Sequence, residues 1–176
     1  MSARHYVYYN SLFGNKLIQA GYINRDQMRQ AELTSRRSGI PLREVVESLT
    51  GQPLPPDLRR QYKKQQLFEL KILYGVESLD MEVDKISTNQ VAELIDTLIS
   101  IDICRQYRLV PLSNYETVPP SVLVAMVDPD NLDARDDLER ILRPQGIGWQ
   151  RMAIAPEDYQ QLIYSYQEEQ LTSSPA

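Results

Sequence analysis

Apolar residues near the start of the chain recur at helical spacing. Phe13 and Leu17 lie one helical turn apart, and Gly21 follows as a candidate C-terminal cap, because glycine readily adopts the left-handed conformation in which many helices end. Asn24 and Gln27 then have the spacing of a capping box, in which each side chain accepts a hydrogen bond from the other's backbone N–H. The pattern predicts two helices, the second continuing to about residue 37.

A third helix and a long fourth helix follow. Four apolar residues at helical spacing mark the third, which ends at Gly51: Leu42, Val45, Val46 and Leu49. Several prolines separate it from a helix that Asp57 begins and that continues to about Tyr74. Segments 12–21 and 41–51 resemble each other, each being a short helix followed by a turn and a longer helix. Two such units pack naturally as a four-helix bundle.

The second half of the chain mixes helical and strand patterns. The predicted helices occupy 87–98, 101–107, 132–142 and 156–166. The predicted strands are shorter and occupy 107–112, 121–127 and 149–154. Ser87 and Gln90 form another capping-box pattern at the start of the first of these helices.

These elements predict an α+β fold in two parts. A helical bundle spans 1–76, a connector 77–87, and a small α/β subdomain with about three strands 88–168. Residues 169–176 end in a small, polar sequence that is typical of a linker, here one leading to a further domain.

Composition and charge narrow the function classes. A net charge of −5 argues against bulk nucleic-acid binding, which calls for a basic surface. The lone cysteine, Cys104, and the lone histidine, His5, exclude an internal disulfide and any motif that needs two of either residue. No apolar run approaches the ~20 residues that span a bilayer, and the start lacks the apolar core of a signal peptide. These features predict a cytoplasmic protein without membrane insertion.

The sequence contains no recognisable catalytic motif. A nucleotide-hydrolysing P-loop needs G-x-x-x-x-G-K-[ST], and Gly14-Asn15-Lys16 lacks its first glycine, its spacing and its Ser/Thr. Cys104 lies in apolar helical surroundings without a neighbouring base, so we interpret it as a small buried hydrophobe. The chain is expected not to be an enzyme and to need no cofactor of its own.

An acidic cluster and a basic helix face each allow two interpretations. The acids from Asp128 to Glu139 lack the glycine and glutamate positions of a calcium loop, so Asp130 or Asn131 is expected to cap a helix, with no metal site. On the long helix, neighbouring cations form either a solvated face or a docking face for phosphates or an acidic partner: Arg59, Arg60, Lys63 and Lys64.

Two apolar groups also need interpretation. The aromatic residues Tyr6, Tyr8 and Tyr9 are either a partner anchor or part of an unstructured tail. The apolar run of the long helix is expected to be core: Leu67, Phe68, Leu70, Ile72 and Leu73.

Two stretches of the α/β half carry a family resemblance. They are Tyr107-Arg108-Leu109-Val110-Pro111-Leu112 and Val124-Ala125-Met126-Val127-Asp128-Pro129-Asp130-Asn131-Leu132-Asp133-Ala134. This order resembles the N-terminal domain of the ATPases that drive type II secretion and type IV pili. The likeness runs from about residue 14 to 166, and residues 61–77 are most similar to cyanobacterial pilus extension ATPases of the PilB-like type.

Relatives with the MshEN form of this domain bind cyclic di-GMP through two tandem motifs, each opening Arg-Leu-Gly and closing on Gln. The resemblance places the first on Leu12, Phe13, Gly14, Leu17, Gly21 and Met28, closing near Ser35. It places the second on Pro41, Leu42, Arg43, Val46 and Leu58, closing near Gln65.

The match to these motifs is partial. Leu12 and Pro41 replace both opening arginines, Arg43 replaces a glycine and Ser35 replaces a glutamine. Loss of two cations that stack on guanine would cost roughly 1–2 kcal/mol each, or about a hundredfold in affinity. Arg43 or Arg36 could substitute for them.

The resemblance implies a regulatory and docking domain on a hexameric pilus ATPase, cytoplasmic and located at the inner-membrane pilus machine. Its partners would be the pilus platform or regulatory proteins, with ATP and magnesium bound only by a separate motor domain. The alternatives are a cyclic di-GMP sensor module and a stand-alone adaptor.

Overall fold

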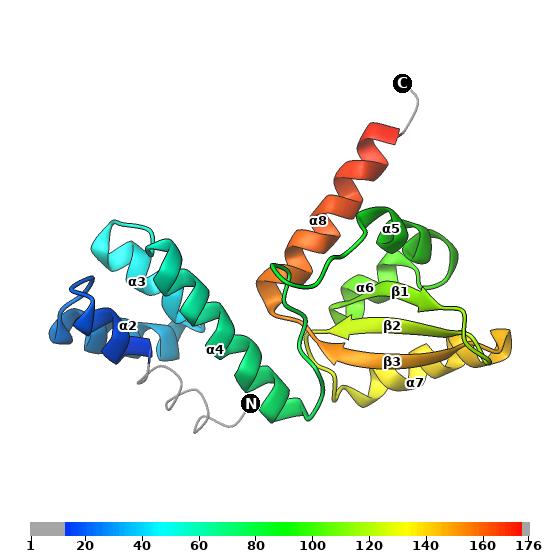
Figure 1. The fold of residues 1–176 in the computed structure, drawn as a ribbon, viewed down its shortest axis with the longest axis horizontal. Coiled ribbons are helices and arrows are strands. Elements are labelled where there is room, and N and C mark those ends of the chain that lie inside the picture. Colours follow the sequence, from blue (N-terminus) through cyan, green and yellow to red (C-terminus); the bar gives the residue numbers. More distant parts are fainter. Residues whose placement is uncertain (1–12, 174–176) are drawn as a thin grey trace. The chain divides into compact units, whose positions relative to one another are not determined.

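A computed structural model describes residues 13–173. It consists of two compact units, a helical unit up to Gln66 and an α/β unit from Leu67 onward (Figure 1). Their division falls inside one helix rather than in the predicted 77–87 connector. The predictions for Tyr6, Tyr8, Tyr9 and Leu12 lie outside the described residues.

The helical unit follows the predicted order of helices. Residues 13–19 are helical, and α2 (Arg25–Ser38), α3 (Leu42–Thr50) and the first part of α4 (Pro56–Tyr74) follow. Both halves of the Asn24–Gln27 capping box form, with distances of 2.8 and 3.2 Å. Gly51 ends α3 in the left-handed conformation, with φ of 67°, which confirms its predicted capping role.

The core of the helical unit joins side chains from all four helical segments. Its buried members are Phe13, Leu17, Ile23, Met28, Ala31, Leu42, Val45, Val46, Leu54 and Tyr62. The rings of Phe13 and Tyr62 lie 4.7 Å apart between centroids, a separation at which tilted aromatic rings attract each other. We call this group the bundle core.

The α/β unit contains a three-stranded sheet with helices before, between and after its strands. In chain order the elements are α5 (Thr88–Thr97), α6 (Ile101–Tyr107), β1 (Leu109–Tyr115), β2 (Ser121–Met126), α7 (Leu132–Leu142), η1 (Arg143–Gln145), β3 (Gly148–Ala153) and α8 (Pro156–Ser173). The strand order is β1-β2-β3. The first pair is antiparallel and the second parallel, because β1 and β2 are joined by a hairpin while α7 carries the chain back between β2 and β3.

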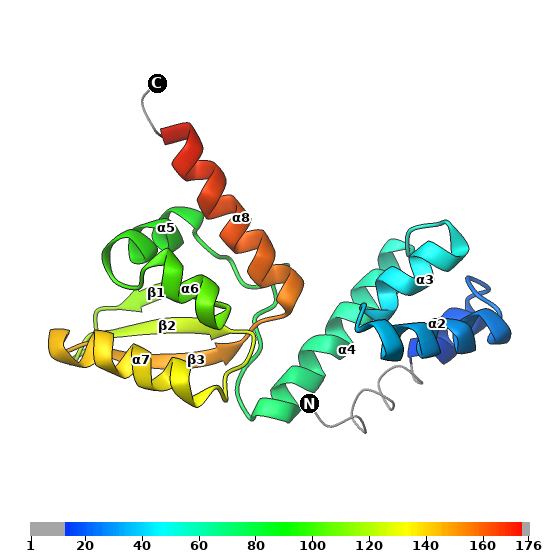
Figure 2. The same ribbon diagram turned by 180° about the vertical axis from the view of Figure 1, so that it is seen from behind.

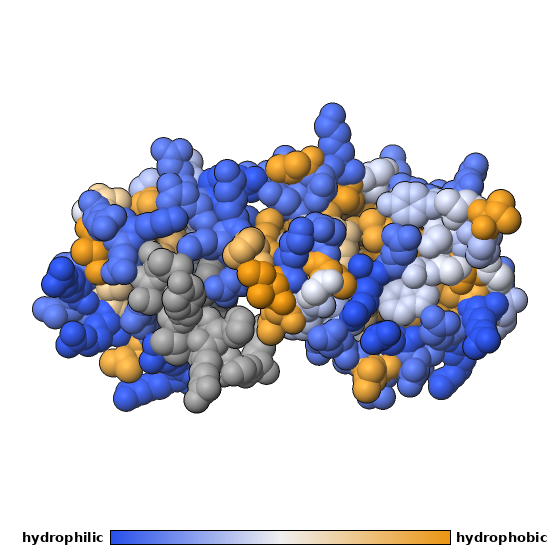
Figure 3. All heavy atoms as spheres, turned by 60° about the horizontal axis from the view of Figure 1, so that its bottom comes forward, coloured by the Kyte–Doolittle hydropathy of each residue, from blue (hydrophilic) through white to orange (hydrophobic). Residues whose placement is uncertain are grey.

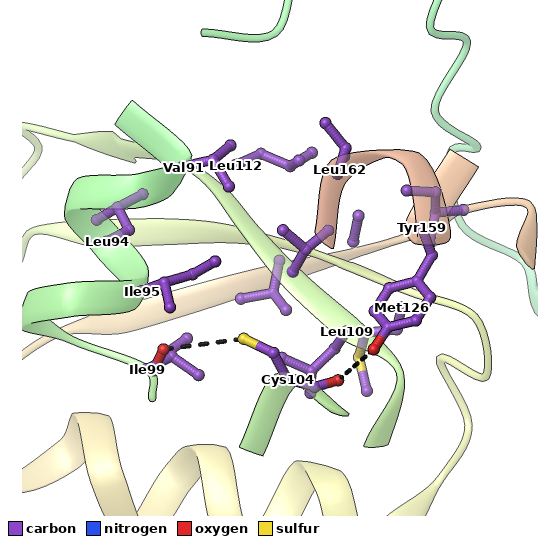
Figure 4. Packing of buried hydrophobic residues seen from close by; sticks show 14 of the residues in the cluster. Val91, Leu94, Ile95, Ile99, Cys104, Leu109, Leu112, Met126, Tyr159 and Leu162 are labelled. Carbon is purple, nitrogen blue, oxygen red and sulfur yellow. Dashed lines mark hydrogen bonds between the residues drawn. The ribbon is translucent and has the colours of Figure 1, made fainter. Parts of the chain in front are cut away.

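Helices α6 and α7 cover the same face of this sheet. They lie behind the strands in Figure 1 and in front of them in Figure 2. A large apolar core fills the space between helices and sheet, and Figure 4 shows part of it around Cys104 and Leu109. The α+β class predicted from the sequence is confirmed.

Several local predictions were wrong in detail. The first strand begins at Leu109 rather than Tyr107, since α6 continues to Tyr107 and Arg108 caps it with a φ of 52°. Ser87 caps α5 as expected, but the Gln90 side chain donates to Asn114 at 2.7 Å instead of completing a capping box. The last helix continues to Ser173, into the segment predicted to be a linker.

The division within α4 has a packing cause. Leu67 and Leu70 are buried and pack with Ala153 and Ala155 at the end of β3, so the last part of α4 belongs to the α/β unit. Within the described part of the chain, the helices lack the length and hydrophobicity that crossing a bilayer demands.

Candidate functional site

The two motif segments of the helical unit meet in the bundle core. Phe13, Leu17 and Val46 are completely buried, and Leu42 and Met28 nearly so. Leu58 packs against the same cluster as a partly buried residue. The duplicated pattern therefore brings both segments into one place, although most of its side chains are used for packing.

Gly14 lies against Met28 of α2. A Cβ atom at this position would lie 3.1 Å from both Cγ and Cε of Met28, which is tighter than ordinary van der Waals contact. Gly21 has a different role, because its φ of +74° is a backbone conformation that side chains disfavour. Both glycines thus fix the path of the first motif.

The residues that depart from the motif have their own partners. Ser35 is buried, and its hydroxyl donates a hydrogen bond to the carbonyl oxygen of Ile40 at 2.7 Å. The Arg43 guanidinium pairs with Glu47 one turn along α3, with 3.0 Å between Nε and Oε1. Pro41 stands at the N-terminal end of α3 without a capping hydrogen bond, and Gln65 is half-buried.

The basic residues of α4 are not equally accessible. Arg59 and Lys64 are exposed, whereas Arg60 and Lys63 are half-buried. At 100° per residue, Arg59 and Lys64 lie about 140° apart around the helix. The cations therefore form a broad flank of α4, and their docking role stays a prediction.

The apolar run at the end of α4 is only partly core, contrary to the sequence prediction. Leu67 and Leu70 are buried, but Phe68 is 62% exposed and Ile72 56% exposed; Leu73 is also exposed. In Figure 3, hydrophobic side chains gather at the centre of the view, over the C-terminal end of α4. We call Phe68 and Ile72, which lie one turn apart, the α4 apolar face.

The sequence contained a signal for this exposure. The four apolar residues at 67, 68, 70 and 72 cannot share one side of a helix, because consecutive positions are about 100° apart. The buried pair selects one side, so Phe68 and Ile72 point the other way. Near them, Lys71 Nζ pairs with Glu77 Oε1 at 2.8 Å.

The acidic cluster before α7 serves to shape the chain. Asn131 caps α7 by accepting a hydrogen bond from the Ala134 N–H at 3.0 Å, which confirms the capping prediction. Asp130 pairs with Arg151 of β3 at 2.8 Å. The pKa of Tyr74 is raised by burial and by the nearby carboxylates of Asp128 and Asp130. Among residues 13–173, no group of three or more His, Cys, Asp or Glu side chains is placed to hold a metal ion.

Cys104 is a packing residue in the core of the α/β unit. Its side chain is completely buried, and burial raises the pKa of the thiol to about 12. Reactive cysteines need the opposite, a lowered pKa and access to substrate. The interpretation of Cys104 as a buried hydrophobe is confirmed.

Comparison with known protein families identifies one family. The model of the MshEN domain matches residues 79–173, which lie within the α/β unit and exclude the motif-bearing helices. A solved structure described as "Structure of MshE with cdg" is 19% identical with a TM-score of 0.47, covering 88% of this chain and 97% of that chain. No curated protein matches the chain. The family match covers more than half of the sequence, and the chain therefore belongs to the MshEN domain family, as the resemblance predicted.

Proposed function

We propose that this chain is a non-catalytic regulatory and docking domain of a type IV pilus extension ATPase. It would couple the motor to proteins of the pilus platform or to regulators, at the inner membrane. Membership of the MshEN family supports this assignment. ATP and magnesium would be bound by a separate motor domain, since this sequence has no P-loop.

The observation that carries the docking role is the α4 apolar face. Phe68 and Ile72 are more than half exposed on a helix whose opposite side is already buried. Each side chain keeps a little over half of its surface in water, so covering it with a partner would stabilise the complex by roughly 1–2 kcal/mol. Two adjacent residues of this kind are a suitable centre for a protein interface.

The test uses the full-length protein that carries this chain. Phe68→Ser combined with Ile72→Ser should abolish or strongly reduce piliation while leaving protein level and ATPase activity unchanged. Val118→Ser with Leu132→Ser is the matched control, since both residues are exposed apolar side chains elsewhere in the α/β unit. Normal piliation in the α4 double variant would remove this face from the proposal.

Cyclic di-GMP sensing is a second candidate function. The convergence of both motif segments in the bundle core favours it, together with the close approach at Gly14. The residues fit the ligand only in part, because Pro41 cannot stack on a guanine as arginine would. Arg43 could, by exchanging its half-buried pair with Glu47 for the ligand.

Calorimetric titration with cyclic di-GMP tests the second function, with cyclic di-AMP and GTP as controls. Selective binding with a Kd below ~10 μM, near −7 kcal/mol, that is lost in Arg43→Ala would support sensing. Leu17→Asp would not discriminate, because Leu17 is a completely buried core residue. If titration of the folded protein with cyclic di-GMP releases no heat, sensing is excluded and protein docking remains as the proposed function.

A further inference from the structure

The two units carry opposite net charges. Residues 1–66 contain 11 Lys and Arg against 5 Asp and Glu, a net charge of +6. Residues 67–176 contain 8 against 19, a net charge of −11. The net charge of −5 is therefore the sum of a basic helical unit and a more strongly acidic α/β unit. The helical unit by itself has a charge that attracts anions.

Four arginines concentrate this positive charge on one side of α2. Arg25, Arg29, Arg36 and Arg37 are all exposed. With Leu33 they fall within an arc of about 120° around the helix, which extends about 18 Å along its axis. Met28, Ala31 and Ser35 lie opposite and are buried. We call this outward side the α2 arginine face; Asp26 is the acid that it includes.

These arginines have no polar partner among the residues that the structure describes. None of the four forms an ion pair or side-chain hydrogen bond with any residue in the range 13–173. Arg25 and Arg29 lie four residues apart, a spacing at which like charges on a helix repel each other. Since the clustered arginines form no stabilising polar contacts within the described residues, we expect them to bind negatively charged groups of another molecule.

We propose that the α2 arginine face binds the headgroups of anionic phospholipids and holds the helical unit against a membrane surface. This inference does not depend on the proposed function. The face is the outer side of a helix, and its apolar member, Leu33, is 46% exposed. The centre of a protein interface is usually formed by several apolar anchors in pockets, whereas this face is mostly arginine. An anionic membrane surface attracts each of these arginines separately.

The negative charge of the α/β unit determines which unit faces the membrane. The negative surface that attracts a net charge of +6 repels one of −11, so the helical unit would face the lipid. Arginine suits phosphate oxygens, because its planar guanidinium donates two parallel hydrogen bonds. Leu33 would enter the headgroup layer between the arginines.

The experiment is co-sedimentation of the 176-residue chain with vesicles of phosphatidylglycerol and phosphatidylcholine, and with pure phosphatidylcholine vesicles. The chain should bind only the anionic vesicles, and the binding should weaken with salt. Each Arg→Gln substitution on the face should lower the partition constant about fivefold. The quadruple variant should lose more than tenfold while its circular dichroism spectrum and melting temperature remain those of the parent.

A matched variant controls for net charge. Lys85, Arg105, Arg135 and Arg143 are exposed cations of the α/β unit, and their replacement by Gln removes the same charge. This control should bind vesicles within twofold of the parent. Equal loss in both quadruple variants, or no binding to anionic vesicles, would overturn the proposal. Arginine-dependent binding to polyglutamate without vesicle binding would also overturn it, in favour of an acidic protein partner.

Discussion

The phenolic hydroxyl of Tyr159 donates a hydrogen bond to the backbone carbonyl oxygen of Cys104, with 3.0 Å between the two oxygens (Figure 4). It links α8 to α6 across 55 residues of sequence. Burial of the Tyr159 ring raises the pKa of this hydroxyl, which keeps it protonated as a donor. The last helix of the family domain is thus tied to the helix that precedes the sheet.

Tyr159→Phe should therefore destabilise the α/β unit by about 1 kcal/mol, the net value of a hydrogen bond between neutral groups. The carbonyl of Cys104 keeps its second donor, the Arg108 N–H, so a larger loss is not expected. Urea unfolding measures the change. Tyr164→Phe, at an exposed position of the same helix, should shift stability by less than half as much; equal shifts would contradict the role of the buried bond.

Stability should fall as pH rises above about 9. Burial raises the pKa of Cys104 from 9.0 to about 12, so the folded state favours the protonated thiol. This contribution is complete below pH 9 and is lost progressively toward pH 12, by at most about 1.4 kcal/mol per pH unit. Urea unfolding at pH 7, 9 and 10 should show a shallower decline for Cys104→Ala. Parallel declines would exclude the thiol as the cause.

Ser35→Ala should destabilise the helical unit by about 1 kcal/mol. The substitution removes the buried hydroxyl that donates to the carbonyl oxygen of Ile40, and the net value of such a hydrogen bond is about 1 kcal/mol. Ser38→Ala serves as control, because Ser38 is exposed and its hydroxyl bonds only to near neighbours, donating to the Thr34 carbonyl and accepting from the Ile40 N–H. Thermal unfolding that shows equal losses for both would contradict a special role for Ser35.

Gly14 and Met28 should show energetic coupling. Ala favours helix over Gly by roughly 1 kcal/mol, but in the parent the new methyl group would press on Met28. Gly14→Ala should therefore stabilise the Met28→Ala variant and fail to stabilise the parent. A double-mutant cycle measures this, and the same effect in both backgrounds would mean that Met28 moves aside freely.

Neighbouring apolar residues of α4 should respond differently to Ser. Leu70→Ser places a polar group in a buried site and should lower the free energy of unfolding by at least ~2 kcal/mol. Phe68→Ser should stay within about 0.5 kcal/mol, since that side chain is mostly in solvent. Chemical denaturation compares the two. A large loss in Phe68→Ser would show that this side chain is covered in solution.

Local patterns were sufficient for most elements. The capping residues Asn24, Ser87 and Asn131 act on N–H groups three residues away, so the sequence alone placed the starts of α2, α5 and α7. The strand segments were also found, because their β-branched residues and bounding turns are local features. The family resemblance depended on the same short stretches.

The tertiary structure alone decided which side of each helix is buried and which residues the polar side chains contact. Sequence spacing could not tell which side of α4 would be buried, because that depends on contact with Ala153 and Ala155 at the end of a strand some eighty positions away. Nor could it show that Ser35 would be buried or that the Gln90 side chain would bond to Asn114. The sequence by itself determined the helices, the strands, the family and the charge of each segment, since these follow from neighbouring residues. Burial and exposure, and with them the surfaces left for partners, arise from contacts between distant segments and therefore required the fold.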